Sequence, residues 1–276
     1  MKKNYATKIL TALTFLFFQL GFSQTTTWTG ASWDNGAPTI TVDAIISSGT
    51  CPILVDTEVK SIIIQDGAVL SVDESITLTI QDNIQVLGSG QFIVNNNASI
   101  LQNNASAVNV GNITYSRDAM PMRQFEFTYW GSPVAGQVLN VFSPLTLSDK
   151  FYSYNANVGV NNWVIENQNN VMTPGKGYAI RAPQGYTSTP QVFSGQFVGT
   201  PNNGNVSANV VAFNPMLLNY NLLANPYPSA INVVTLIDNS NLGTLYFWTH
   251  NSAIASNVFT SDDYAIRTRT TGTAAV

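Results

Sequence analysis

The chain of 276 residues offers one histidine and one cysteine for chemistry, His250 and Cys51. A serine triad or a cysteine–histidine dyad would have to use His250, and these two residues are too few ligands for a zinc site. His250 follows the aromatic run that ends at Trp248, which predicts a surface or turn histidine. Cys51 has no second cysteine to pair with, and the neighbouring Pro52 and Ile53 predict a small buried apolar residue. Neither residue points to a catalytic or metal site.

Glycoside hydrolysis would need two carboxylates that face each other about 5–9 Å apart across a groove. Most acidic residues instead fall where chain corners are expected, and corner aspartates cap their own backbone. Glu126 and Glu166 are exceptions, because they lie within or beside aromatic runs. Asp262 and Asp263 could bind calcium, but their spacing fits no known calcium loop, so corner chemistry is favoured. We therefore predict no enzymatic activity, no cofactor and no metal. The corner carboxylates are Asp66, Asp73, Glu74, Asp82 and Asp238.

Aromatic side chains are the remaining candidates for recognition. Trp130, Trp163 and Trp248 could stack on sugar rings and so form a weak glycan-binding site. Alternating aromatics in a β-sandwich more often belong to the core. Both interpretations stay open at the level of sequence.

The first 23 residues have the layout of a secretory signal peptide. Lys2, Lys3 and Lys8 precede an apolar stretch of about ten residues, and small residues prepare a cut near Ser23-Gln24. The apolar stretch is too short to span a bilayer, which needs about 20 residues. We expect residues 1–23 to be removed on export, with no transmembrane span and no lipid-anchored cysteine.

Removal of the three lysines leaves eight of the eleven basic residues against fifteen acidic ones, a net charge of −7. Such a surface repels phosphate backbones, so nucleic acid is a poor partner. Only 9% of the residues are charged, while 45% are apolar. That balance is ample for a core and argues against general disorder.

Residues 24–117 predict a Trp-rich opening segment followed by short β-helix-like repeats. Trp28 and Trp33 flank a glycine, as if to lay aromatics over the end of a sheet. Strands of four or five residues then recur about every eight residues, separated by Asp, Asn and Gly corners. Asparagines 95–97 suit corners with positive φ. A short parallel solenoid is favoured over a sandwich of hairpins, because two-residue hairpin turns are few. The expected strands are 61–64, 68–72, 76–80, 84–87, 91–94 and 98–101.

Residues 118–276 have longer spacing, more aromatics and more prolines, and they predict a β-sandwich-like domain. Several runs alternate aromatic with polar residues, which is typical of sheets with one buried face. No run has the pattern of a helix of three turns. The expected strands are 125–130, 150–154, 163–165, 178–180, 192–195, 245–248 and 264–266.

Several motifs occur in a recognisable order after the Trp-Thr-Gly of residues 28–30. They are Ser132–Gln137, Phe151–Asn155, Met172–Tyr178, Leu222–Ala230 and Tyr246–Thr249. In this order the chain resembles a large group of secreted and surface β-proteins of Bacteroidota, of the flavobacterial type, that are exported by the type IX secretion system. The resemblance spans nearly the whole mature chain, and its most specific pieces are Asn225–Ser229 and Pro174–Tyr178. Members of the group end in a C-terminal sorting domain that this chain lacks, so we expect the 118–276 domain to be truncated.

The resemblance implies an exported, non-catalytic protein of the cell surface or the extracellular space with a structural or adhesive role. Its partners would be surface polysaccharide or other cell-surface proteins, together with the export machinery. The alternative is a carbohydrate-binding module of a secreted polysaccharide-degrading protein.

Overall fold

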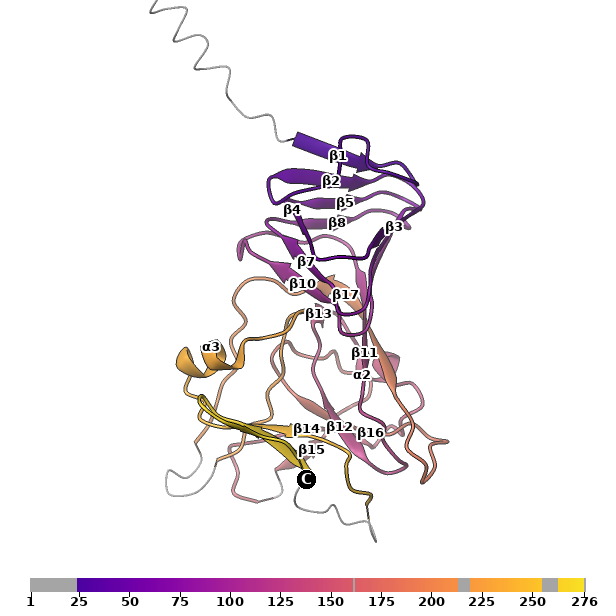
Figure 1. The fold of residues 1–276 in the computed structure, drawn as a ribbon. Helices are drawn as coiled ribbons and strands as arrows, with labels where there is room; N and C mark the ends of the chain where they lie inside the picture. Colours follow the sequence, from indigo (N-terminus) through magenta and orange to yellow (C-terminus); the bar gives the residue numbers. More distant parts are fainter. Residues whose placement is uncertain (1–23, 161, 213–218, 255–262, 276) are drawn as a thin grey trace, which may run out of the picture.

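The computed structural model describes residues 24–160, 162–212, 219–254 and 263–275. It is nearly all β, with 37% of residues in strands and 4% in helices. A β-solenoid of about four turns forms one end of the molecule, and further sheets follow it (Figure 1). The expected signal peptide lies outside the described residues.

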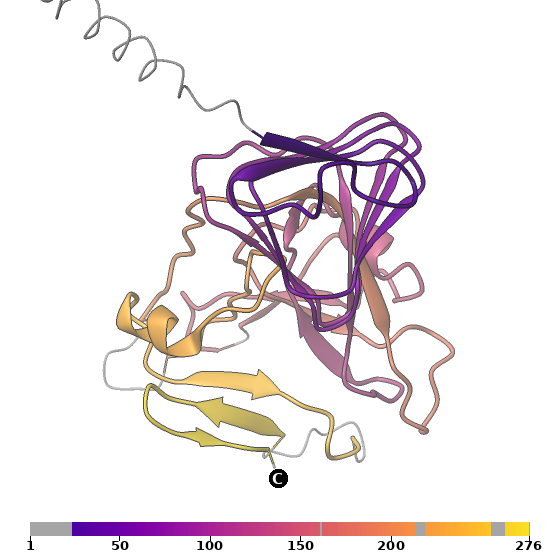
Figure 2. The ribbon, with the colours of Figure 1, turned by 45° about the horizontal axis from the view of Figure 1, so that its top comes forward.

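The solenoid has three parallel faces, and between residues 42 and 102 successive strands along the chain belong to successive faces. Seen obliquely from the end that carries β1 (Gln24–Trp28), the coils stack on one another (Figure 2). Parallel pairing of this kind excludes the sandwich of hairpins for this region. The first face contains β1 (Gln24–Trp28), β2 (Val42–Ile46), β5 (Ile62–Ile64) and β8 (Ile84–Val86). The second contains β3 (Thr50–Ile53), β6 (Val69–Val72), β9 (Gln91–Val94) and β11 (Ile113–Asp118). The third contains β4 (Thr57–Val59), β7 (Thr77–Ile80) and β10 (Ser99–Gln102).

The register places each inward side chain on the equivalent side chain of the next coil. Ile62 pairs with Ile84, and Leu70 pairs with Phe92, an offset of 22 residues in both cases. Alternate residues of these strands are buried because successive side chains of a strand point to opposite faces. The solenoid core is therefore a set of aliphatic stacks that run along its axis.

The corners contain the expected residue types, but some of their side chains form hydrogen bonds to the next coil. Asn97 has a φ of 62°, the conformation expected for a corner asparagine. The Asp66 carboxylate accepts hydrogen bonds from the backbone N–H and the hydroxyl of Ser89, 23 residues later. Asp56 likewise accepts the backbone N–H of Thr77 in the next coil. The expectation that corner aspartates cap their own backbone is thus wrong for Asp66, because the stacked coil brings donors of the next coil equally close.

Each end of the solenoid is joined to other structure. At the N-terminal end, Trp28 and Trp33 pack edge to face with ring centroids 5.6 Å apart. At the other end, β17 (Ser194–Pro201) pairs antiparallel with β11 and continues the second face. The expected boundary after residue 117 consequently falls inside β11, a strand that the solenoid and the following region share.

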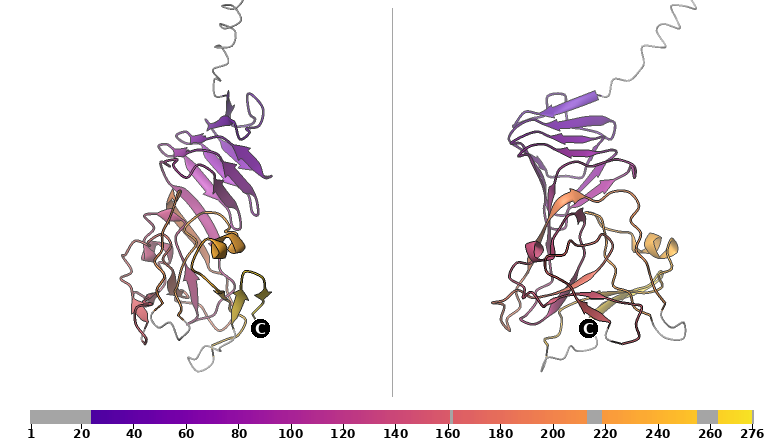
Figure 3. Two further views of the ribbon diagram at one scale, coloured as in Figure 1. Left: turned by 90° about the vertical axis from the view of Figure 1, so that its left-hand side faces the viewer. Right: turned by 180° about the vertical axis from the view of Figure 1, so that it is seen from behind.

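The following region is antiparallel, and its two main sheets lie at the end of the molecule away from β1 (Figures 1 and 3). Its two described helices, α2 (Leu139–Phe142) and α3 (Val233–Asp238), are short. The larger sheet has the order β12 (Phe127–Trp130), β16 (Tyr178–Arg181), β14 (Phe151–Tyr154) and β15 (Trp163–Ile165). The smaller sheet consists of β18 (Leu245–Trp248), β19 (Tyr264–Arg267) and β20 (Gly272–Thr273). The remaining strand, β13 (Val134–Ala135), pairs with β17.

Candidate functional site

The larger antiparallel sheet presents an aromatic face toward the smaller sheet. Tyr129 on β12, Tyr154 on β14 and Trp163 on β15 share this face. Directly paired residues, and residues two apart on one strand, point to the same side of a sheet, and the register relates these three residues in that way. The Trp163 ring lies 6.0 Å from the Tyr129 ring and 5.2 Å from the Tyr154 ring, measured between centroids. Trp248 of β18 approaches Tyr129 from the smaller sheet, at 6.3 Å. We call these four residues the aromatic cluster.

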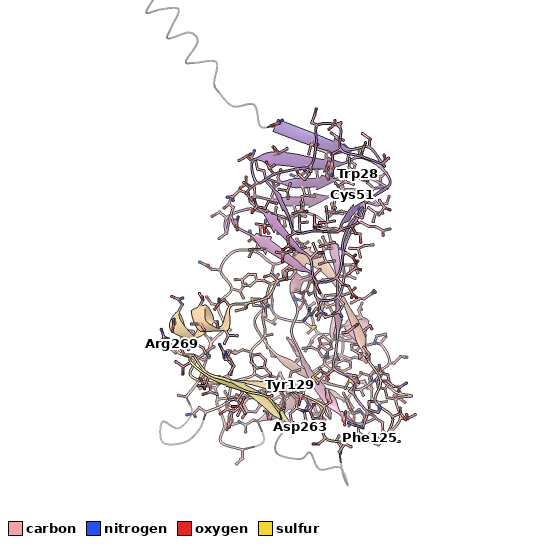
Figure 4. The ribbon with its side chains drawn as sticks, in the orientation of Figure 1. Trp28, Cys51, Phe125, Tyr129, Asp263 and Arg269 are labelled. Atoms are coloured by element: carbon pink, nitrogen blue, oxygen red, sulfur yellow. The ribbon has the colours of Figure 1, made fainter. Side chains whose placement is uncertain are left out.

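A hydroxyl pair closes one side of the aromatic cluster. The hydroxyls of Tyr129 and Tyr264 are hydrogen-bonded at 2.8 Å, and burial raises the pKa of Tyr129, so that its phenol stays protonated. The Tyr264 ring also packs edge to face on Trp248 at 4.9 Å. The most accessible member of the cluster is Trp163, which is 45% exposed. Tyr129 and Tyr264 lie at the end of the molecule remote from Trp28, as Figure 4 shows for Tyr129.

Two of the three tryptophans considered for glycan stacking therefore come together. Trp163 and Trp248 flank Tyr129. Trp130 follows Tyr129 on β12 and points to the opposite face, where its ring packs 4.9 Å from Phe142 and 5.8 Å from Phe193. We assign Trp130 to the core and keep the other two as candidates for recognition.

A buried polar cluster lies beside β12. It consists of Arg123, Glu126, Thr128, His250 and Asp263. Glu126 is 1% exposed, and its carboxylate accepts hydrogen bonds from the backbone N–H of Arg123 at 2.7 Å and from the Arg123 guanidinium at 3.2 Å. The same guanidinium donates to the carbonyl of His250 at 3.3 Å. Residues far apart in sequence are thus joined by charge-assisted hydrogen bonds.

His250 is 7% exposed, so the expectation of a surface histidine is wrong. Its Nε2 shares a 2.7 Å hydrogen bond with the Thr128 hydroxyl. Its Nδ1 lies 3.3 Å from a Glu126 oxygen, without the geometry of a hydrogen bond. The imidazole is buried because Arg123, Glu126 and Thr128 pack against it from the β12 side. The aromatic residues that precede His250 in sequence gave no sign of these contacts.

Electrostatics at this cluster favour a neutral imidazole. Burial lowers the pKa of His250, and the carboxylates of Glu126 and Asp263 oppose only part of that effect. Asp263 is itself buried, and both its oxygens lie within 3.3 Å of the backbone N–H of Ser252. Asp263 therefore anchors the turn after β18, whereas Asp262 lies outside the described residues.

The polar cluster has the order of a hydroxyl, an imidazole and a carboxylate, which is the order of a hydrolytic triad. The Thr128 hydroxyl also lies 3.5 Å from the Met122 sulfur, and the imidazole and carboxylate beside it are buried. Sequence reasoning singled out Glu126 as unexplained but missed Arg123 and Thr128. One feature of the sequence could have indicated the cluster. A charged residue, Glu126, stands inside an aromatic run, and an arginine lies three residues before it.

The remaining reactive groups have structural partners. Cys51 is fully buried, as the sequence predicted, and burial raises the pKa of its thiol to about 12. Burial also raises the pKa of Glu166, but hydrogen bonds from Lys176, Ser153 and Asn170 outweigh it and hold that pKa below its usual range. Among the described residues, no three His, Cys, Asp or Glu side chains are grouped to hold a metal ion.

The motif Asn225–Ser229 joins the two regions. The Asn225 side chain accepts the backbone N–H of Tyr227, which forms a tight turn. The Pro228 carbonyl accepts the backbone N–H of Ile100 in β10 at 2.7 Å, and so covers the last strand of the third solenoid face. The Tyr227 hydroxyl is hydrogen-bonded to the Gly204 carbonyl. Through the Pro228 carbonyl the motif links the antiparallel region to the solenoid.

The motif Pro174–Tyr178 docks on the chain just before Asn225. The carbonyl of Gly175 accepts the backbone N–H of Ala224, and Lys176 bridges to Leu223. A β-carbon at Gly177 would lie 2.6 Å from Leu222, so only glycine fits there. The two most specific motifs of the sequence therefore form one structural unit.

No helix among the described residues is long and apolar enough to cross a membrane. No curated protein and no solved structure matches this chain significantly. Residues 21–275 match the family described as a domain of unknown function, DUF8693. Since this match covers nearly the whole chain, the protein belongs to the DUF8693 family.

Proposed function

We propose that this chain is an exported, non-catalytic protein of the cell surface or extracellular space with a structural or adhesive role. The observation that carries the proposal is the partly open aromatic cluster around Trp163, at the end of the molecule remote from β1. A solenoid held by axial stacks acts as a stiff spacer, and the antiparallel region supplies the contact surface. Export rests on the lysine-flanked apolar segment of residues 1–23. The route through the type IX system rests on the family resemblance.

The absence of catalysis is part of the proposal. The imidazole and carboxylate of the polar cluster are buried, and the cluster bonds strands to one another. Such a network supports packing between distant segments. Turnover of any polysaccharide by the purified protein would contradict this part of the proposal.

A second candidate function is a carbohydrate-binding module of a secreted polysaccharide-degrading protein. It is favoured by one observation, the exposed ring of Trp163 flanked by two tyrosines, which suits stacking on a sugar ring. The loop before Trp163 is held in place by the Asn162 side chain, which donates hydrogen bonds to the Asn155 and Val158 carbonyls.

Binding assays separate the two candidates. The chain without residues 1–23 is tested on a glycan array and on bacterial cell envelopes. The adhesive role predicts saturable envelope binding without affinity for soluble glycans, and the carbohydrate-binding role predicts glycan affinity. In either case Trp163→Ala should weaken binding by about tenfold, the loss typical of a truncated aromatic contact.

The matched control is Leu54→Ala, which removes an apolar side chain from the solenoid that is even more exposed, at 61% against 45% for Trp163. That variant should bind like the wild type. Equal losses in both variants, or no loss in Trp163→Ala, would remove the aromatic cluster from the function.

A further inference from the structure

We infer that β15 is an open sheet edge that pairs with β15 of a second copy of this chain. The strand is the last in its sheet, and among the described residues it pairs with β14 alone. Its three residues, Trp163, Val164 and Ile165, are all apolar and all exposed, at 45%, 44% and 60%. Apolar side chains on both faces of an exposed edge strand are a template for further pairing.

The backbone of β15 has its free groups at two defined positions. Glu166 N–H donates to the Phe151 carbonyl, and Asn155 N–H donates to the Asn162 carbonyl, each at 2.8 Å. Because bonded residues alternate along an antiparallel pair, Trp163 and Ile165 direct their N–H and C=O groups away from β14. Within the described part of the chain, no hydrogen bond to these outward groups is present.

The edge is complementary to itself about Val164. A two-fold axis there pairs Trp163 of one copy with Ile165 of the other, and Ile165 of the first with Trp163 of the second. The outward N–H and C=O groups of all four residues are then hydrogen-bonded. Each large apolar side chain then meets an apolar partner on the same face, and Val164 meets Val164. The next residue, Glu166, would face Asn162 rather than another carboxylate, and its own charge is already held by Lys176 at 2.6 Å. No like charges oppose each other, which favours a second copy as the occupant.

The solenoid shows how this chain protects an edge when it must. The outermost strands of the second and third faces are β3 and β4. β3 carries Pro52, whose position in the register directs its missing N–H toward the open side, and β4 carries the exposed Glu58. Proline and charge are the usual guards against edge pairing. β15 carries neither.

Pairing would join two four-stranded sheets into one continuous sheet through four backbone hydrogen bonds. A three-residue strand buries little area, so the expected dimer is weak and transient. Trp163 belongs to both β15 and the aromatic cluster, but the pairing uses the backbone edge of β15 and does not require a ligand on the cluster. Failed glycan or envelope binding would therefore leave the pairing standing.

The decisive experiment traps the dimer covalently. In the proposed register, the two Val164 residues form a non-hydrogen-bonded pair with Cα atoms about 4.5 Å apart, within disulfide range. Val164→Cys should therefore yield a disulfide-linked dimer under mild oxidation, seen on non-reducing gels. In the Ile165→Cys control, the two cysteines would be diagonal neighbours about 7–8 Å apart and should cross-link far less. Cys51 does not compete, because it is fully buried.

Sedimentation velocity of the unmodified chain up to about 1 mM then tests the equilibrium. A concentration-dependent dimer is expected, weakened at least about tenfold by Ile165→Pro, which removes an outward N–H and spares the bonds to β14. Val164→Lys should do the same through like charges at the axis. Unchanged far-UV circular dichroism controls for folding.

Three results would overturn the inference. They are a monomer at all concentrations with no Val164→Cys cross-link, equal cross-linking of Val164→Cys and Ile165→Cys, and a dimer that Val164→Lys leaves intact. Binding of an unrelated extended peptide to a strictly monomeric chain would also reject the second copy as the occupant.

Discussion

The solenoid and the antiparallel region bury their apolar side chains in different ways. In the solenoid, Ile62 lies on Ile84 and Leu70 on Phe92, so each contact joins neighbouring coils 22 residues apart. In the antiparallel region, Trp130 packs on Phe142 and Phe193, and Tyr129 packs on Trp248. The first arrangement depends on a repeating register, and the second on closure of long loops. Loss of one side chain should therefore act locally in the solenoid but reach distant segments in the antiparallel region.

The largest expected effect comes from truncating one buried side chain of the solenoid core. Ile100→Ala removes a side chain that is 3% exposed, and the resulting cavity should lower the free energy of unfolding by about 2–5 kcal/mol. Leu101→Ala changes the next residue of the same strand, but that side chain is 46% exposed and its loss should be within about 0.5 kcal/mol. Urea unfolding followed by circular dichroism measures both. Similar losses in the two variants would contradict the inward alternation of β10.

The next largest effect concerns the polar cluster. Glu126→Gln removes a buried charge that Arg123 and His250 face, and should cost about 2 kcal/mol, the value typical of hydrogen bonds to charged groups. Hydrogen exchange should lose protection around β12 and β18 while the solenoid amides keep theirs. Glu58→Gln, on the exposed edge of β4, is the matched control and should change neither. Uniform loss of protection in the solenoid and the antiparallel region would show that the loss of this side chain is not confined to the antiparallel region.

The pH dependence of the antiparallel region should follow His250. Its folded pKa is lowered by burial, so the unfolded chain binds the proton more readily. The corresponding stability is complete above the unfolded pKa of about 6.5 and is lost as the pH falls through the folded value. Since His250 is the one histidine, its proton NMR titration is assigned without ambiguity. His250→Gln should flatten the stability profile as the pH falls below about 6.5. A titration midpoint above 6.5 would reverse the sign.

The smallest effect is expected at a solenoid corner. Hydrogen bonds from Ser89 lower the pKa of Asp66. This contribution is present above the unfolded pKa of about 3.9 and is lost as the pH falls through the lowered folded value. Asp66→Asn should lower the midpoint of thermal unfolding slightly at pH 7, and the difference from wild type should vanish in strong acid. Glu74→Gln in a neighbouring corner should leave the midpoint unchanged.

Much of the solenoid was predictable because its rules are local. Strand spacing, corner residues and the burial of Cys51 all follow from short windows of sequence. The sequence was less informative about Asp66, whose donors on Ser89 lie one coil away and become neighbours only after stacking. The polar cluster was harder still, because Arg123 and His250 are 127 residues apart and no periodic pattern connects them.

By itself the sequence determined an all-β chain with short parallel coils at one end and aromatic strands at the other, since alternation and corner chemistry act within a few residues. Only the tertiary structure decided which aromatics face outward. Trp130 and Tyr129 are adjacent in sequence and point to opposite faces of β12. Trp130 joins the core because Phe142 and Phe193 lie on its face, whereas Tyr129 joins the aromatic cluster because Trp248 of the smaller sheet lies on the other face. The exposure of β15 likewise depends on where its sheet ends, which no window of sequence contains.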